Sequence, residues 1–188
     1  LFIFLTTLLS SLIYFELKNI LSPIDPDTRT QIWAGMDLVV NTLSVGIGLF
    51  ATGRVTKKLG VSFSLSLIPT LLILGFFVLT MMPTVAVIVS LQIVRRAGQY
   101  SITRPAREML FTAVGRNTRF KSKPIIDVVL YRGGDMISAW TITGLTQGLN
   151  LGLATMAGLG AAVAAVWTGI GFILGQKFVH LEKPKKGG

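Results

Sequence analysis

The sequence alternates long apolar runs with short polar segments. Apolar runs occupy residues 1–21, 31–51, 61–82 and 84–103, followed by a run at 124–147 that polar residues interrupt and a cleaner run at 151–178. An α-helix rises ~1.5 Å per residue, so each run is long enough to cross a bilayer core of about 30 Å. The pattern therefore predicts an all-α, polytopic membrane protein with six transmembrane helices.

The overall composition supports a membrane protein. Of the 188 residues, 51% are hydrophobic and only 14% are charged, which leaves too little polar surface to cover a soluble globule. Cysteine is absent, so disulfides, thiolate metal sites and a cysteine nucleophile are excluded. The segment 115–122 (GRNTRFKS) ends in Lys-Ser but lacks the second glycine of a phosphate-binding loop. We expect no enzymatic activity, metal or cofactor.

The formal net charge of +10 lies mainly in the connections between the apolar runs. Because the basic residues form no continuous face, we do not expect a nucleic acid partner. The connections predicted to lie on one side, together with the C-terminal residues from Lys177 onward, carry thirteen lysines and arginines, and the opposite connections carry only Arg29. Positively charged segments stay in the cytoplasm. This bias predicts a multi-pass protein of a cell membrane, with a cytoplasmic loop at 104–123 and a cytoplasmic tail at 179–188.

The first apolar run begins at Leu1, without methionine and without the basic flank and cleavage site of a signal peptide. We expect an N-terminal part to be missing. The partners predicted for this chain are then the lipid bilayer and either the missing N-terminal six-helix half or a second copy, which would cover a polar face.

Polar residues inside the second run fall on one helical face. Asp37, Asn41, Ser44 and Gly48 recur at i, i+4, i+7 and i+11. An aspartate within a membrane span is costly, so this face is expected to line a cavity, with Asp37 and Asn41 as substrate-binding candidates. Packing against another helix through polar contacts is the alternative.

The fifth run holds three charged residues. Asp127, Tyr131 and Asp135 share a face at i, i+4 and i+8, while Arg132 and Asp135 are three residues apart and can pair. Gly133-Gly134 lies between them and favours a kink or a close helix crossing. Asp127, Arg132 and Asp135 are therefore candidate gating charges; the alternative is an ion pair that only permits membrane insertion.

Two adjacent arginines, Arg95 and Arg96, lie within the fourth run. A guanidinium group can hold phosphate or carboxylate bidentately, so both residues are candidate contacts for an anionic solute. The alternative is that they snorkel towards the headgroups or pair with Glu108. Glu16 and Lys18, near the end of the first run, are further ionisable candidates.

Three segments contain motifs that resemble those of known transporters. Segment 52–60 (TGRVTKKLG) is similar to the basic loop of major facilitator transporters. Segments 95–111 (RRAGQYSITRPAREMLF) and 121–135 (KSKPIIDVVLYRGGD) resemble the C-terminal half of bacterial members of the ATP:ADP antiporter, or nucleotide transporter, family. The resemblance implies a bacterial-type inner cell membrane and two six-helix halves that bind ATP and ADP and exchange them by alternating access, with Leu1 in the seventh of twelve helices.

The departures from the family concern its charged positions. Glu108 and Met109 match the family pattern, whereas Arg104 and Arg107 replace other residues. Glu108, Arg104 and Arg107 are gating or ion-pair candidates. Lys18 matches a lysine of the family and is therefore a candidate anion contact. The family also has an acidic residue four positions before this lysine. Tyr14 stands there in this chain, and Glu16 is the nearest acidic residue that could substitute. The expected function is nucleotide exchange. The alternatives are transport of another anionic or a proton-coupled solute, or a non-transporting scaffold or sensor.

Overall fold

A computed structural model describes residues 1–50, 52–111, 126–145 and 152–182 of the chain. Within these ranges the secondary structure is helical, without strands, which confirms the all-α class. The α-helices are α1 (Phe2–Leu21), α2 (Pro26–Phe50), α3 (Thr52–Met81), α4 (Val85–Gly98), α5 (Arg104–Leu110), α7 (Tyr131–Thr143) and α8 (Leu153–Glu182). Two π-helical segments, η1 (Gln99–Thr103) and η3 (Ile126–Leu130), join α4 to α5 and precede α7.

Four of these helices are long and apolar enough to cross a membrane. They are α1, α2, the Lys58–Met81 part of α3 and the Leu153–His180 part of α8. The predicted spans at 84–103 and 124–147 are also helical where they are described, with η1 at the end of the first and η3 at the start of the second. The chain is therefore a membrane protein by the length and composition of its helices.

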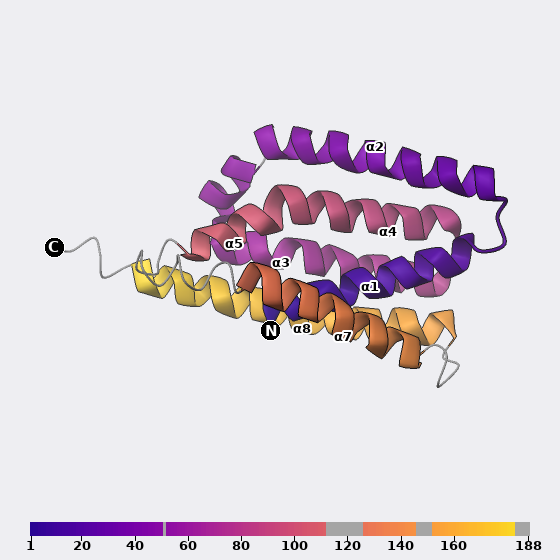
Figure 1. Cartoon of the computed structure of the whole chain (residues 1–188). Helices are drawn as coiled ribbons and strands as arrows, with labels where there is room; N and C mark the ends of the chain where they lie inside the picture. The colour runs from indigo at the N-terminus through magenta and orange to yellow at the C-terminus, as the bar shows by residue number, and fades with distance from the viewer. Residues whose placement is uncertain (51, 112–125, 146–151, 183–188) are drawn as a thin grey trace.

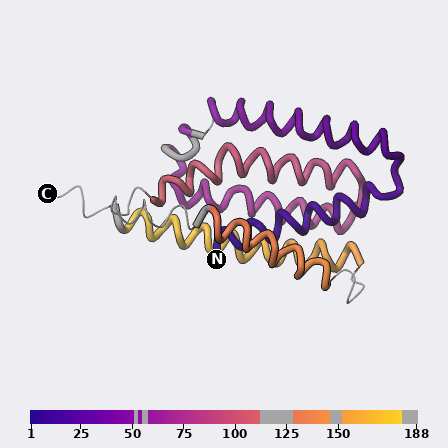
Figure 2. The backbone as a smooth tube through the Cα atoms, viewed as in Figure 1, coloured from indigo at the N-terminus to yellow at the C-terminus, as the bar shows by residue number. Residues whose placement is uncertain are grey.

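The long helices run side by side in one bundle (Figure 1). Helix α3 packs along α8, and α1 lies against α4, α7 and α8. Helix α2 forms the outer edge, where it packs mainly on α4 and η1, and the backbone trace shows the same order (Figure 2). Met36 and Val40 are its only fully buried residues, so most of α2 faces outward.

The core forms where apolar residues recur every three or four positions along α1, α3 and α8. Leu9, Ile13 and Leu17 lie on one face of α1 and are fully buried. Helices α3 and α8 approach so closely that a Cβ on Gly175 would lie 2.2 Å from the Ser62 Cα. Small residues permit this backbone contact, which is how helices associate in lipid where the hydrophobic effect is absent.

Several boundaries differ from the prediction. The predicted cytoplasmic loop at 104–123 is wrong at its start, because Arg104–Leu110 is helical. Pro105 lies in the first turn of this helix, where its missing N–H costs no hydrogen bond. Helix α8 continues to Glu182, four residues into the predicted tail. Residues 112–123 lie outside the described ranges.

Helix α2 begins at Pro26 rather than at residue 31. The Asp25 carboxylate accepts hydrogen bonds from the backbone N–H groups of Asp27 (3.1 Å) and Thr28 (3.2 Å). These two donors lack partners within the helix, so Asp25 caps its first turn. A proline directly after a capping aspartate is a common start of a helix. The polar segment that the sequence suggested as a connection therefore belongs to the helix.

Candidate functional site

The side chain of Arg95 lies in the interior of the bundle, only 9% of the residue being exposed. Its Nε donates to the Gln92 Oε1 at 2.9 Å, one turn earlier on α4. Its Nη1 donates to the Ser10 hydroxyl of α1 and makes a long contact of 3.5 Å with the Gln99 Oε1. Arg95 thus joins α1 to the junction of α4 and η1 through three neutral partners.

Arg95 forms no ion pair with any described carboxylate. In the described part of the chain two ion pairs form, Arg96 with Asp37 and Arg107 with Glu108. Glu108 therefore pairs with Arg107 and not with either arginine of α4. Removing a charge from water costs several kcal/mol even after relaxation, and neutral hydrogen bonds return only part of it. Arg95 is accordingly a buried cation with room for a negatively charged ligand.

A polar cavity of about 240 Å³, here called the Arg95 cavity, opens beside this side chain. Helices α1, α4, α5 and α7 and the segment η1 contribute its walls. Three guanidinium groups face one carboxylate, that of Asp135, and the other lining groups are neutral. The lining residues are Thr6, Thr7, Ser10, Arg95, Arg96, Gln99, Tyr100, Arg104, Tyr131 and Asp135. Because Arg96 is paired with Asp37, Arg95 and Arg104 together outweigh Asp135 and leave the cavity with a net positive charge.

Helix α7 reaches this cavity because of a glycine. A Cβ on Gly134 would lie 2.6 Å from the Thr7 Oγ1, so only glycine lets α7 approach α1 at this point. The close crossing predicted for Gly133-Gly134 is confirmed at Gly134, whereas Gly133 has open space around its Cα. The crossing places Tyr131 and Asp135 at the cavity wall, one turn apart on the same face as predicted.

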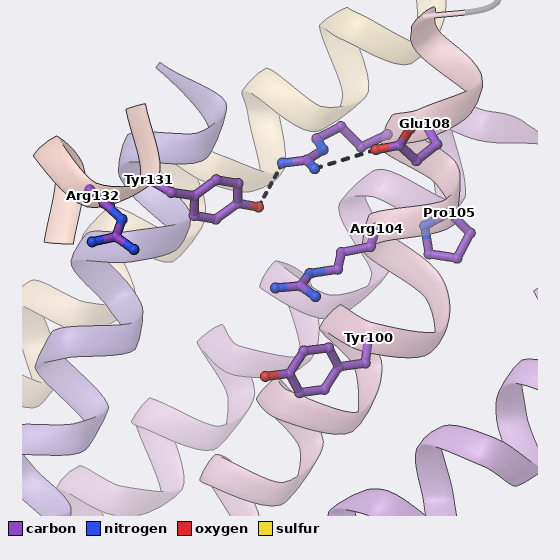
Figure 3. A pocket seen from close by; sticks show the side chains of 7 residues that line it. Tyr100, Arg104, Pro105, Glu108, Tyr131 and Arg132 are labelled. Atoms are coloured by element: carbon purple, nitrogen blue, oxygen red, sulfur yellow. Dashed lines mark hydrogen bonds and ion pairs between the residues drawn. The ribbon is translucent and has the colours of Figure 1, made fainter. Parts of the chain in front are cut away.

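A second polar cavity of about 650 Å³, here called the Arg132 cavity, lies between α5 and α7 (Figure 3). The Arg107 Nη1 donates to the Tyr131 hydroxyl at 2.6 Å, and the Arg107 Nη2 lies 3.6 Å from the Glu108 Oε1. The Arg104 guanidinium lies over the Tyr100 ring, 4.7 Å from its centroid. The residues that line the Arg132 cavity are Tyr100, Arg104, Pro105, Arg107, Glu108, Tyr131 and Arg132.

The polar face of α2 does not line either polar cavity. Asp37 pairs with Arg96 of α4. This is a polar contact between two helices, which was the alternative to a cavity. Asn41 is exposed, and the buried Ser44 hydroxyl has no hydrogen-bond partner among the described residues. Asp37 and Asn41 therefore line neither of these two cavities, and their role in substrate binding stays a prediction.

The remaining predicted residues are dispersed. Arg132 and Asp135 form no ion pair with each other and line different cavities. Lys18 is exposed, whereas Glu16 is buried and its Oε2 has no hydrogen-bond partner in the described ranges. Neither residue lines the two polar cavities. The side chain of Asp127 lies outside what the structure describes.

Several lining residues were missed by the sequence reasoning. Ser10, Gln92 and Gln99 bind Arg95, and Thr6 and Thr7 line its cavity. A helical spacing was available as a signal, since Gln92, Arg95 and Gln99 recur at i, i+3 and i+7 and Thr6 precedes Ser10 by one turn. Uncharged residues of this kind also occur singly on buried helix faces, so they drew no attention.

Comparison with models of protein families, with curated proteins and with solved structures found no match to this chain.

Proposed function

We propose that this chain is one six-helix half of a secondary transporter that moves an anionic solute through the Arg95 cavity. The observation that carries this proposal is the burial of Arg95 among neutral partners beside a positively charged cavity. An ionisable residue inside a membrane helix faces a polar pathway or a partner charge. A solute that carries negative charge would supply the charge that the described residues do not.

Two π-helical segments support a functional site within the bundle. The fourth and fifth spans each contain one such segment at one end, and residues of both spans line the Arg95 cavity. The backbone stays α-helical where these segments join α4, α5 and α7, and π-helical turns occur often at functional sites. Together with the four long helices, these two spans make six. The charge bias of the connections supports a cytoplasmic C-terminus, and the resemblance to bacterial antiporters supports a bacterial-type cell membrane.

The size of the Arg95 cavity supports a half-site. Its volume of about 240 Å³ is below the ~300–1,000 Å³ that is usual for a complete small-molecule pocket. A phosphate group fits such a space, and the rest of a larger solute would extend towards the second half of the transporter. The resemblance of the sequence to nucleotide antiporters suggests ATP and ADP, which arginine forks bind through their phosphates.

The test is ATP binding in detergent and ATP–ADP exchange in liposomes, with Arg95→Lys and Arg95→Ala compared to wild type. We expect both variants to bind ATP about ten to a hundred times more weakly, because a charge-assisted hydrogen bond is worth roughly 1.5–3 kcal/mol. Lysine should fail because a point charge cannot replace the planar fork.

Arg54→Ala is the matched control, since this exposed arginine bonds only to the Phe50 carbonyl in the described ranges, 2.7 Å away, and lines neither polar cavity. It should keep wild-type binding and exchange. Wild-type affinity in both Arg95 variants, at equal thermal stability, would remove Arg95 from the site and with it the proposal.

A further inference from the structure

The Arg132 cavity has an excess of positive charge of its own, separate from that of the Arg95 cavity. Three guanidinium groups and one carboxylate line it, and these arginines are not equivalent. Arg107 is held by the Tyr131 hydroxyl and by Glu108. Arg104 and Arg132 form no ion pair within the described ranges, and both are exposed. Two cations therefore line this cavity without an ion-pair partner among the described residues.

From these contacts we infer that the Arg132 cavity is a second anion site, which binds a phosphate group between Arg104 and Arg132. Figure 3 shows the two guanidinium groups pointing into the same space, Arg104 from the α5 side and Arg132 from α7. This inference stands on its own geometry and does not require that the chain transports a solute.

The aromatic residues set the orientation of the donors. A guanidinium stacked over a ring keeps the N–H groups at its edge available, so Arg104 can donate to a ligand while the Tyr100 ring supports it. The Tyr131 oxygen accepts a hydrogen bond from Arg107, which leaves the hydroxyl hydrogen of Tyr131 to donate into the cavity. Tyr131 therefore adds a neutral donor between the two arginines.

This arrangement favours phosphate over carboxylate. Arg104, Arg132 and Tyr131 supply three separate donor groups around the cavity. A tetrahedral phosphate has enough oxygens to accept from all three, whereas a carboxylate offers only two oxygens in one plane. The same phosphate chemistry has two possible sources, a phosphorylated solute in the cytoplasm and the headgroup of an anionic lipid. A cavity volume of about 650 Å³ accepts either.

The lining residues allow the two sites to be separated by mutation. Arg132 lines only the Arg132 cavity, Arg96 lines only the Arg95 cavity, and Arg104 lines both. Arg104 therefore lies at the boundary of the two spaces. Loss of Arg132 should affect one site, and loss of Arg104 should affect both.

The experiment is a calorimetric titration of inorganic pyrophosphate into the protein in dodecyl maltoside at low salt. We expect Arg132→Gln to weaken one class of binding at least tenfold and Arg96→Gln to leave that class unchanged. Arg104→Gln should weaken it as well. Arg54→Gln is the control for a general loss of positive charge, because Arg54 is also exposed and lines neither cavity.

Nanodiscs distinguish the two phosphate sources. In pure phosphatidylcholine the Arg132-dependent binding should persist; added phosphatidylglycerol should abolish it if the site holds a lipid headgroup and leave it intact if the site holds a soluble phosphate. The inference is overturned if Arg132→Gln binds pyrophosphate like wild type, or loses no more affinity than Arg54→Gln. If the proposed transport fails instead, the Arg132-dependent binding remains while the Arg95 variants have no effect on ATP binding.

Discussion

The two adjacent glycines of α7 allow a matched test of the crossing between α1 and α7. Gly133→Ala places its new Cβ in open space, whereas the Cβ of Gly134→Ala would lie 2.6 Å from the Thr7 Oγ1. Short carbon–oxygen contacts are ~3.3 Å, so the second alanine is about 0.7 Å too close. The two substitutions change the same helix by the same atoms. Their difference in unfolding free energy therefore isolates the contact with Thr7.

The expected magnitudes follow from the two ways in which the contact can relax. Both alanines stabilise the helix by about 0.5–1 kcal/mol, which cancels in the comparison. If Thr7 rotates, it loses the 2.9 Å hydrogen bond from its Oγ1 to the Phe4 carbonyl, at a cost of about 0.5–1.5 kcal/mol. If α7 moves away from α1 instead, overpacking costs about 1–3 kcal/mol. Gly134→Ala should thus be less stable than Gly133→Ala by about 0.5–3 kcal/mol.

The measurement is equilibrium unfolding in mixed micelles of dodecyl maltoside and sodium dodecyl sulfate, followed by tryptophan fluorescence, since Trp167 is fully buried. Thr7→Ala should restore stability in the Gly134→Ala background, because it removes the atom that the new Cβ meets. Equal unfolding free energies for the two glycine variants would show that α7 does not cross α1 at Gly134. The walls of the Arg95 cavity would then be arranged differently.

Two further predictions concern the pair across α2 and α4 and the topology. A double-mutant cycle of Asp37→Asn and Arg96→Gln should give a coupling of about 0.2–1 kcal/mol in detergent, because the two side chains remain 51% and 26% exposed; no coupling would mean that the pair does not form. The chain has no cysteine, so a single cysteine can be introduced as Thr28→Cys or as Lys58→Cys. The two variants should react with an impermeant maleimide from opposite sides of the membrane. Labelling of both from one side would exclude the predicted orientation.

The secondary structure was predictable because it depends on local sequence. Long apolar runs form helices in any apolar environment, since lipid offers no partners for backbone N–H and C=O groups. The six runs are therefore helical at nearly the predicted positions wherever the structure describes them. The starts of α2 and α5 differ from the prediction because Pro26 and Pro105 lie outside the apolar runs, yet each occupies the first turn of a helix.

The sequence also determined that Arg95 needs polar surroundings, because a cation within an apolar run has few alternatives. Which partners it finds was decided by the tertiary structure. Arg95 and Arg96 are adjacent, yet successive residues on a helix point about 100° apart, so one reaches Ser10 of α1 and the other Asp37 of α2. Helical periodicity defines a face but not the neighbour that covers it.

The same reason separates Arg132 from Asp135. Their spacing allows an ion pair in an isolated helix, but the crossing at Gly134 turns Asp135 towards the Arg95 cavity and leaves Arg132 beside α5. Sequence spacing gives the contacts that one helix can make with itself. The packing of α1, α4, α5 and α7 selects which polar groups share a cavity, because it depends on contacts between residues far apart in the chain.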